Sequence, residues 1–360
     1  HQVNLSELTT LRVGGPAPHM TTVTTRDQLI RFCIDHPLTS GSESVLFIAG
    51  GSNLLISDDG FAGPVCLIRT QGIAETPGEN ERVRVRAQAG FTWDEFVKHT
   101  VDSELSGLEA LSGIPGSVGA TPVQNVGAYG AEVAELICSV TLFDRFEGEV
   151  RECAPDELEF GYRTSLLKTT AAQLGQPRYI VLDVEFELEK AAESAPVRYG
   201  QLASALGVEI GERAPLAGVR EAVLQLRASK GMVLNAHDHD TWSAGSFFTN
   251  PILPANPEPG DPCVPEGAPT YPVRNPTTGE VDEKVVKTSA AWLIDHAGFD
   301  KGFALNDRAS LSTKHTLALT NRGQAKAEDI VELARHIRDG VAQTYGITMH
   351  PEPNFVGCQI

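Results

Sequence analysis

Residues 107–130 read GLEALSGIPGSVGATPVQNVGAYG. The stretch holds six glycines and two prolines, and no charged side chain follows Glu109. Glycine tolerates positive φ and lets a ligand approach the backbone closely, whereas proline removes a donor and fixes φ, so we expect neither an ordinary helix nor a central strand. The backbone N–H groups are then available to an anion, as in a phosphate-binding nest. A plain surface loop is the alternative, but long loops are usually functional, which favours a ligand-binding loop.

A second glycine-rich turn follows a short apolar run, residues 45–48, which is typical of a buried strand. The turn consists of Gly50, Gly51, Ser52 and Asn53. A buried strand that leads into such a turn is another way to bind an anion, although turns of this kind often have a structural role alone. No G-x-G-x-x-G sequence lies between an expected strand and an expected helix, so the sequence does not support a Rossmann dinucleotide site.

Both segments resemble the FAD site of the UDP-N-acetylenolpyruvoylglucosamine reductase family. Residues 114–120 and 124–130 are similar to the family's FAD pyrophosphate loop, and other motifs extend the resemblance from about Leu8 to Gly357. The resemblance implies an α+β fold of three domains: two form the FAD-binding fold of the vanillyl-alcohol-oxidase flavoproteins, and the third is an α+β substrate-binding domain. The implied domains are 1–72 with 353–360, 73–232, and 233–352. Without the resemblance, the patterns indicate only an α+β, multidomain, anion-binding chain.

The resemblance also implies a set of residues that bind FAD without a covalent link. They are Gly50, Gly51, Ser52, Asn53, Ile114, Pro115, Gly116, Gly119, Ala120, Gln124, Asn125, Gly127, Arg163 and Arg227. Flavin oxidases of the same superfamily commonly attach FAD through a His or a Cys. Residues 107–130 contain neither, which favours the reductase.

Composition restricts the possible partners and the compartment. The chain has 360 residues, of which 41% are hydrophobic and 21% charged, as in an ordinary globular protein with two or three domains. The net charge of −18 argues against nucleic acid and acidic membranes, and an anionic substrate needs local cations. The six cysteines show no C-x-x-C pair or metal spacing, so we expect free thiols in a reducing cytoplasm. We also expect no signal core, no membrane-spanning run, and trimming of the initiator methionine before His1.

Local patterns predict the main helices and strands. Thr25 and Thr92 each open a capping-box pattern, so helices should begin there. Residues 179–189 alternate between apolar and acidic side chains, which predicts a half-buried strand. The proline-rich residues 251–280 should be mostly irregular. Further strands are expected at 65–69, 83–87 and 137–144, and further helices through Val219 to Leu226, at 289–295 and at 328–345.

Two motifs contain candidates for electrostatic and acid–base chemistry. Arg163 follows Tyr162 in EFGYRTS, residues 159–165, and its planar guanidinium suits a carboxylate, although stacking on the tyrosine at the surface is the alternative. Ser246 lies in AGSFFTNP, residues 244–251, where no G-x-S-x-G sequence or triad order supports a nucleophile, and a cap or a core turn is the alternative. In the family, the arginine binds the enolpyruvyl carboxylate and the serine is the general acid. A serine hydroxyl can serve as an acid only for a strongly basic, developing carbanion.

A third motif is HPEPNFVG, residues 350–357. Glu352 lies between two prolines, so a solvated surface turn is the alternative to a functional role. The resemblance implies that this glutamate, near the substrate carboxylate, helps to stabilise the enolate-like state. One relative carries an arginine two residues later, where this chain has Asn354, so the basic contact of that position is not carried over.

The resemblance implies further residues that bind the substrate. Tyr199, in YGQL at residues 199–202, is similar to the tyrosine that closes over the nucleotide-sugar diphosphate in the first of the family's two classes, whereas packing on a core is the alternative. The other expected contacts come from Tyr162, Arg227, Lys230, Asn250 and His315, and their cations would supply the local positive field.

The sequence HDHD, residues 237–240, raises the question of a metal site. Adjacent residues of a loop point in different directions, and no further ligand is spaced to join them. We therefore expect a solvated loop and no metal.

These features lead to one principal hypothesis and two alternatives. The resemblance implies an enzyme that uses FAD and NADPH to reduce UDP-N-acetylglucosamine enolpyruvate to UDP-N-acetylmuramate in peptidoglycan precursor synthesis. A flavin oxidase that is reoxidised by oxygen, and a sugar-nucleotide-binding module without catalysis, are the alternatives. The presence of all three candidate catalytic residues favours the enzyme over the binding module.

Overall fold

The computed structural model describes residues 2–360, which form two compact units. Unit 1 contains the residues up to Pro18, Gly51–Ala62 and Ser229–Ile360. Unit 2 contains His19–Gly50 and Gly63–Ala228. Each unit combines helices with sheets, which confirms the α+β class. The three-domain division expected from the family remains a prediction.

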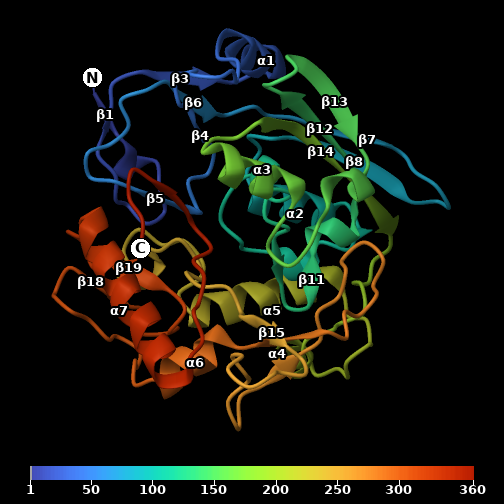
Figure 1. The fold of residues 1–360 in the computed structure, drawn as a ribbon. Coiled ribbons are helices and arrows are strands. Elements are labelled where there is room, and N and C mark those ends of the chain that lie inside the picture. The colour runs from blue at the N-terminus through green and yellow to red at the C-terminus, as the bar shows by residue number, and fades with distance from the viewer. Residues whose placement is uncertain (1) are drawn as a thin grey trace. The chain divides into compact units, whose positions relative to one another are not determined.

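Unit 2 is built on a six-stranded sheet whose neighbouring strands are antiparallel. Helix α1 (Arg26–Asp35) lies on one side of this sheet, and α2 (Trp93–Asp102) and α3 (Leu166–Leu174) lie on the other (Figure 1). The strand order is β13 (Glu149–Cys153), β12 (Ile137–Asp144), β14 (Tyr179–Lys190), β8 (Val83–Gln88) and β7 (Ile73–Pro77), and β9 (Leu105–Ser106) pairs with β14.

Strand β14 corrects one expectation, because both of its faces are buried over residues 180–186. Phe186 packs against the aromatic rings of α2 on the apolar face. On the acidic face, the side chain of Asp183 is fully buried and accepts hydrogen bonds from Arg26 of α1 and Arg86 of β8. The prediction of a half-buried strand was wrong, since arginines from distant segments cover the carboxylates and satisfy their charge.

The remaining elements of unit 2 flank this sheet. Strands β3 (Met20–Val23), β6 (Val65–Ile68) and β4 (Leu46–Ile48) form a parallel sheet, and α4 (Gly200–Leu206) and α5 (Leu216–Ser229) follow β14. Thr25 caps α1 by accepting a hydrogen bond from Gln28 N, as predicted. Thr92 occupies the N-cap of α2, but its side chain makes no capping bond. The predicted positions of both helices are therefore confirmed, whereas the capping bond at Thr92 is not.

Unit 1 packs its core around α7 (Ala327–Tyr345). Ile330, Leu333, Ile337 and Val341 are buried along one stripe of this helix, as the sequence predicts. The helix lies against the hairpin of β18 (Ala309–Leu311) and β19 (Leu319–Asn321), as Figure 1 shows. The other elements are α6 (Ala290–His296), the antiparallel pair β1 (Val3–Asn4) and β2 (Pro16–Ala17), and the parallel pair β5 (Leu54–Ile56) and β20 (Asn354–Val356).

The proline-rich segment 251–280 has little regular structure, which confirms the prediction. Within residues 2–360, its strands are β15 (Ile252–Pro254) and β16 (Thr270–Tyr271), and both pair with β17 (Val285–Thr288). All six cysteines are free thiols, also as predicted.

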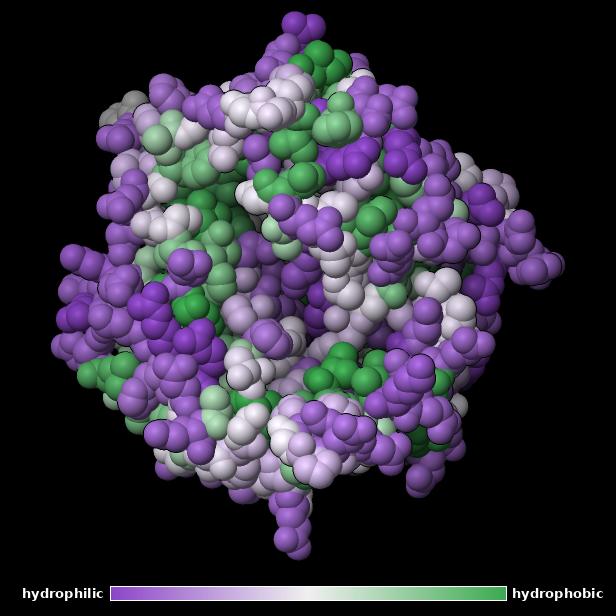
Figure 2. All heavy atoms as spheres, in the orientation of Figure 1, coloured by the Kyte–Doolittle hydropathy of each residue, from purple (hydrophilic) through white to green (hydrophobic). Residues whose placement is uncertain are grey.

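Two further properties concern the surface and the membrane. Hydrophilic side chains cover most of the face in Figure 2, in keeping with the net charge of −18. Within residues 2–360, every helix is too short or too polar to span a lipid bilayer.

Candidate functional site

The loop 107–130 in unit 2 consists of short turns, as its glycines and prolines predict. It contains the 3-10 turns η2 (Glu109–Leu111) and η3 (Val118–Ala120), and it ends in the small hairpin of β10 (Gly127–Ala128) and β11 (Ala131–Glu132). The segment that precedes α2 holds the loop at several points. Gly116 O accepts from Trp93 N at 3.0 Å, Val118 N donates to Phe91 O at 2.9 Å, and Gly119 N donates to Ala89 O at 2.9 Å.

Glycine is required where this loop meets the end of β4. A Cβ atom on Gly50 would lie 2.6 Å from Gly116 Cα, and one on Gly119 would lie 2.6 Å from Ala89 Cβ. Gly116 also has a φ of 118°, a conformation that favours glycine. The structure therefore brings the two glycine-rich segments of the sequence together through Gly50 and Gly116. Gly51, Ser52 and Asn53 belong to unit 1, where a Cβ on Gly51 would lie 1.9 Å from Leu8 O.

The buried side chain of Asn125 fixes the second half of the loop. Its Nδ2 donates to Glu132 and to Gly161 O, and its Oδ1 accepts from Ala134 N at 3.1 Å. Its φ of 45° is in the left-handed region, where asparagine is one of the better-tolerated residues. The predicted FAD-binding residue Asn125 thus also determines the shape of the loop.

Arg163 lies against this half of the loop. Its Nη1 donates to Asn125 O at 3.2 Å, and its Nη2 donates to Gly127 O at 2.9 Å. The guanidinium also lies 5.0 Å from the centroid of the Tyr162 ring. The stacking that the sequence left as the alternative is therefore present, but the side chain is only 18% exposed and binds the loop backbone.

We call Gly50 together with the loop 107–130 the cradle, and it fits the pyrophosphate of FAD in two respects. The backbones of Gly50 and Gly116 pack directly on each other, which brings the two glycine-rich turns together with no side chain between them. The hydroxyl of Ser117 is buried and has no hydrogen-bond partner within residues 2–360. A buried polar atom of this kind calls for a partner, and a ligand oxygen can supply one.

Arg227, near the C-terminus of α5, approaches the same loop from another side. A Cβ on Gly113 would lie 3.3 Å from Arg227 Cδ, and Gly113 N donates to Asp94 at 2.6 Å. Burial lowers the pKa of Arg227, and the carboxylate of Asp94 acts in the opposite direction. Burial also disfavours the ionised form of Asp94, but hydrogen bonds from Arg220 and from Gly113 outweigh it and lower the pKa of this carboxyl. The predicted cation thus lies beside the start of the loop.

Tyr199 immediately precedes α4 and also faces the loop. Its ring packs edge-on against Tyr129 with 5.6 Å between the centroids, and the residue is 42% exposed. Its neighbour Arg198 pairs with Glu135 at 2.7 Å. Tyr199 therefore lies at the surface of unit 2, beside the loop, and the core packing that the sequence left as the alternative is only partial.

In unit 1, backbone hydrogen bonds align the segments that carry Ser246, His315 and Glu352. Phe247 N donates to Leu317 O at 2.7 Å, and Glu352 N donates to Phe247 O at 2.7 Å. The segment of Ser246 therefore lies between the segments of the other two residues. Asn53 joins the group, because Asn354 N donates to Asn53 O at 2.9 Å.

Asn250 and Lys230, the other substrate contacts expected in unit 1, have separate surroundings. Asn250 Oδ1 accepts from Ala290 N at 3.0 Å, at the start of α6. Lys230 follows the last residue of α5.

The HDHD segment, residues 237–240, is only partly solvated, which corrects the expectation of a solvated loop. His237 is exposed, whereas Asp240 is 3% exposed and accepts from Thr313 and Arg322. Within residues 2–360, no group of three or more His, Cys, Asp or Glu side chains could hold a metal ion. Sequence reasoning missed this role of Asp240, because its partners lie 73 and 82 residues away along the chain.

Comparisons with known proteins assign both parts of the chain. The family model of the FAD binding domain matches residues 27–154, and that of the UDP-N-acetylenolpyruvoylglucosamine reductase C-terminal domain matches residues 237–356. The reductase of Nocardia farcinica is 52% identical over 369 residues, with 99% of this chain and 90% of the relative covered. That of Cutibacterium acnes is 49% identical over 360 residues with the same coverage. The crystal structure of the reductase from Thermus caldophilus has a TM-score of 0.63 at 27% identity, and it covers 99% of this chain and 98% of that one.

Proposed function

Because the chain belongs to the UDP-N-acetylenolpyruvoylglucosamine reductase family, we propose that it reduces UDP-N-acetylglucosamine enolpyruvate to UDP-N-acetylmuramate, with FAD as cofactor and NADPH as electron donor. The full-length similarity to the reductases carries this proposal. The alignment of the Ser246, His315 and Glu352 segments supports it independently, since these residues are far apart in the sequence.

The FAD site is proposed to use the two glycine-rich segments and Arg163. The backbone of Gly50, Ile114–Ala120 and Gln124–Gly127 would bind the pyrophosphate, with Ser117 as an additional donor. Arg227 would contribute positive charge at the start of the loop. When bound, FAD supplies the hydride chemistry that links the nicotinamide donor to the enol ether.

The protein's own residues would bind and polarise the substrate. Arg163 would bind the enolpyruvyl carboxylate, and Glu352 would stabilise the charge that develops beside it, which is usually the largest catalytic contribution. Ser246 would then donate its Oγ proton to the carbon on which negative charge builds up. Tyr162, Tyr199, Lys230, Asn250 and His315 would complete the substrate site, with Tyr199 over the diphosphate.

The proposal includes the three-domain organisation and the compartment. Residues 1–72 with 353–360 and residues 73–232 would bind FAD, and residues 233–352 would bind the substrate. Six free thiols are typical of a reducing compartment, so we place the reaction in the cytoplasm.

An anaerobic experiment in two steps tests the function. NADPH is added to the purified yellow protein until the flavin band disappears, and UDP-N-acetylglucosamine enolpyruvate is then added. The reductase should regain its colour with the substrate and only slowly with air. Rapid recovery with air, and none with the substrate, would instead identify a flavin oxidase. A protein without flavin after gentle purification would contradict the FAD site.

Ser246→Ala tests the acid within the same experiment. We expect flavin reduction by NADPH to be unchanged and the reoxidation by substrate to slow by about 10²- to 10⁴-fold, as for the loss of a general acid. Ser243→Ala is the matched control, because Ser243 lies on the same segment and its hydroxyl accepts a local hydrogen bond from Gly245 N. Equal reoxidation rates for Ser246→Ala and the wild type would exclude Ser246 as the acid.

A further inference from the structure

Two carboxylates of the HDHD segment hold a turn on a distant part of unit 1. Asp240 accepts from both the N–H of Thr313, at 2.9 Å, and the hydroxyl of the same residue. Arg322 Nη1 donates to Asp240 from the end of β19, at 2.8 Å. Asp238 pairs with Lys314 Nζ, also at 2.8 Å. Two successive residues of the turn, 313 and 314, are thus bound to two carboxylates of one short segment.

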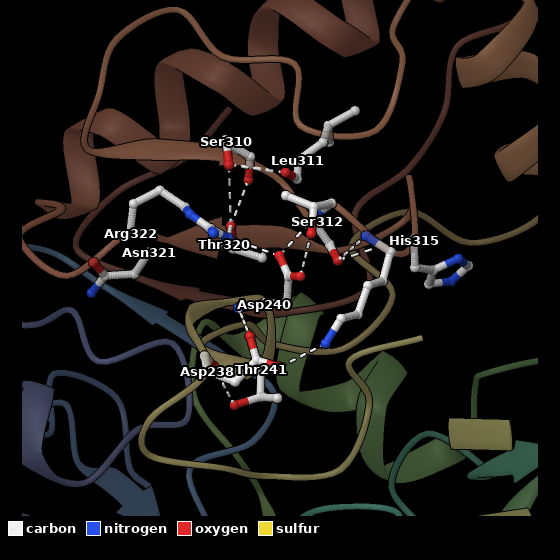
Figure 3. A network of polar contacts seen from close by, with 12 residues as sticks. Asp238, Asp240, Thr241, Ser310, Leu311, Ser312, His315, Thr320, Asn321 and Arg322 are labelled. Atoms are coloured by element: carbon white, nitrogen blue, oxygen red, sulfur yellow. Dashed lines mark hydrogen bonds and ion pairs between the residues drawn. The ribbon is translucent and has the colours of Figure 1, made fainter. Parts of the chain in front are cut away.

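The turn itself is closed by Ser312, which is fully buried. Its hydroxyl oxygen accepts from Lys314 N at 3.0 Å and from His315 N at 3.2 Å. The backbone of 312–315 is therefore fixed from inside by Ser312 and from outside by Asp240, while Asp238 holds the side chain of Lys314. In Figure 3 the ring of His315 points away from both carboxylates, whose contacts are with Thr313 and Lys314.

The same segment leads directly to Ser246. Ser243 forms a β-bridge with Thr320, Asn321 N donates to Trp242 O at 2.9 Å, and Phe247 N donates to Leu317 O at 2.7 Å. Residues 240–247 thus run beside 313–321, with the Asp240 contacts at one end and Ser246 near the other. A shift of the turn would change the position of His315 relative to Ser246.

We propose that Asp238 and Asp240 are positioning residues that fix the turn 312–316 and thereby place His315 beside the Ser246 segment for substrate binding. The inference rests on the proposed function, to which it adds residues that touch neither substrate nor cofactor. It also gives the HDHD segment a role that is not metal binding.

Asp329, another buried carboxylate of unit 1, has contacts that serve the fold alone. Asp329 is 6% exposed, binds Arg308 Nη2 at 2.7 Å and accepts from Lys326 N at 2.8 Å. These contacts fix the first turn of α7 and do not involve the turn 312–316. Asp329→Asn is therefore the matched control for Asp240→Asn, since both changes remove the charge of a buried, arginine-paired aspartate.

The test compares both variants in the holoenzyme. We expect Asp240→Asn to raise the KM for UDP-N-acetylglucosamine enolpyruvate, or to slow flavin reoxidation by it, by about 10- to 100-fold, the effect of a displacement near 1 Å. Flavin reduction by NADPH should stay within about twofold of the wild type, and Asp329→Asn should behave as the wild type in both steps. Equal effects of the two variants would show that Asp240 is merely structural.

A double-mutant cycle determines whether Asp240 acts through His315. If it does, Asp240→Asn in a His315→Ala background should add less than about twofold to the loss of substrate reduction. Losses that multiply would overturn the inference. Thr313→Ser should have a KM close to that of the wild type, whereas Thr313→Val should have a higher KM, because only serine retains the hydroxyl that donates to Asp240.

Hydrogen exchange separates this inference from the proposed function. In Asp240→Asn holoenzyme, the amide of Thr313, which donates to Asp240, should exchange at least about tenfold faster than in Asp329→Asn. The amides of 314 and 315 donate to Ser312 and should exchange faster as well, because the turn loses its outer anchor. Unchanged exchange would exclude Asp240 as the anchor of the turn, even if the enzyme reduces the proposed substrate. If the wild type does not reduce that substrate, the proposed function and the placement for substrate both fail, and the exchange rates alone decide whether the turn is anchored.

Discussion

Gly50→Ala probes the contact on which the proposed FAD cradle depends. The new Cβ would lie 2.6 Å from Gly116 Cα and 2.9 Å from Gly116 C. Both distances are shorter than van der Waals contact, and both involve backbone, which cannot rotate away as the end of a side chain can. Gly50 is not among the residues with positive φ, so the substitution adds a steric clash without dihedral strain.

The size of the effect of Gly50→Ala on stability depends on how firmly hydrogen bonds hold the loop. Gly116 O, Val118 N and Gly119 N each have a hydrogen-bond partner on residues 89–93, at 2.9 to 3.0 Å. The loop therefore cannot move without weakening these bonds, and we expect an overpacking cost of about 1–3 kcal/mol in the free energy of unfolding. If the loop instead shifts without loss of stability, the same free energy should weaken FAD binding, and the dissociation constant of FAD should rise by roughly 5- to 150-fold.

The assay measures both quantities on the same protein. Urea unfolding of the FAD-depleted protein gives the free energy of unfolding, and quenching of flavin fluorescence gives the dissociation constant. Gly218→Ala is the control, because a Cβ there meets nothing within 4 Å on α5, and alanine should stabilise the helix by about 0.5–1 kcal/mol. If Gly50→Ala matches the wild type in both stability and FAD affinity, the segments do not meet as the structure indicates, and the cradle reasoning is refuted.

Three further predictions concern charge and the substrate. Asp183→Asn removes the negative charge and one of the two oxygens that accept from Arg26 and Arg86. It should lower the free energy of unfolding by about 3–5 kcal/mol in urea, as for a broken buried ion pair, and a loss below about 1 kcal/mol would contradict this. For Asp144, burial opposes ionisation, but hydrogen bonds from an arginine and from backbone N–H groups prevail and lower the pKa. The ionised carboxylate therefore stabilises the fold fully above the unfolded pKa of about 3.9, and this contribution is lost as the pH falls through the folded pKa. Asp144→Asn lacks this contribution, so between neutral pH and pH 3 its free energy of unfolding should fall less than that of the wild type. Acid titrations followed by circular dichroism measure the difference. Tyr199→Ala should raise the KM for UDP-N-acetylglucosamine enolpyruvate while FAD affinity and melting temperature stay unchanged, and a parallel loss of FAD would show that the ring supports the loop instead.

The sequence predicted those features that depend on neighbouring residues. The start of α1 at Thr25, the apolar stripe of α7 and the irregular loop 107–130 each follow from propensities or periodicities over a few residues. The motif around Ser246 was equally recognisable, and the structure places its segment between those of two other candidate residues. What the motifs could not give is the arrangement between segments, because a motif specifies residues and not their spatial neighbours.

The two failed expectations about solvation have a common physical cause. The acidic residues of β14 and of the HDHD segment suggested solvation, since an isolated carboxylate is costly to bury. Both Asp183 and Asp240 are nevertheless buried, because arginines from distant segments neutralise them. Acidic residues in a sequence pattern therefore indicate a solvated face only when no arginine or lysine can reach them, and the fold decides whether one can. The partners of Asp183 attach α1 to the sheet, whereas those of Asp240 fix the turn before His315. A buried aspartate paired with arginine therefore stabilises the packing of unit 2, and in unit 1, we infer, it positions a residue for substrate binding.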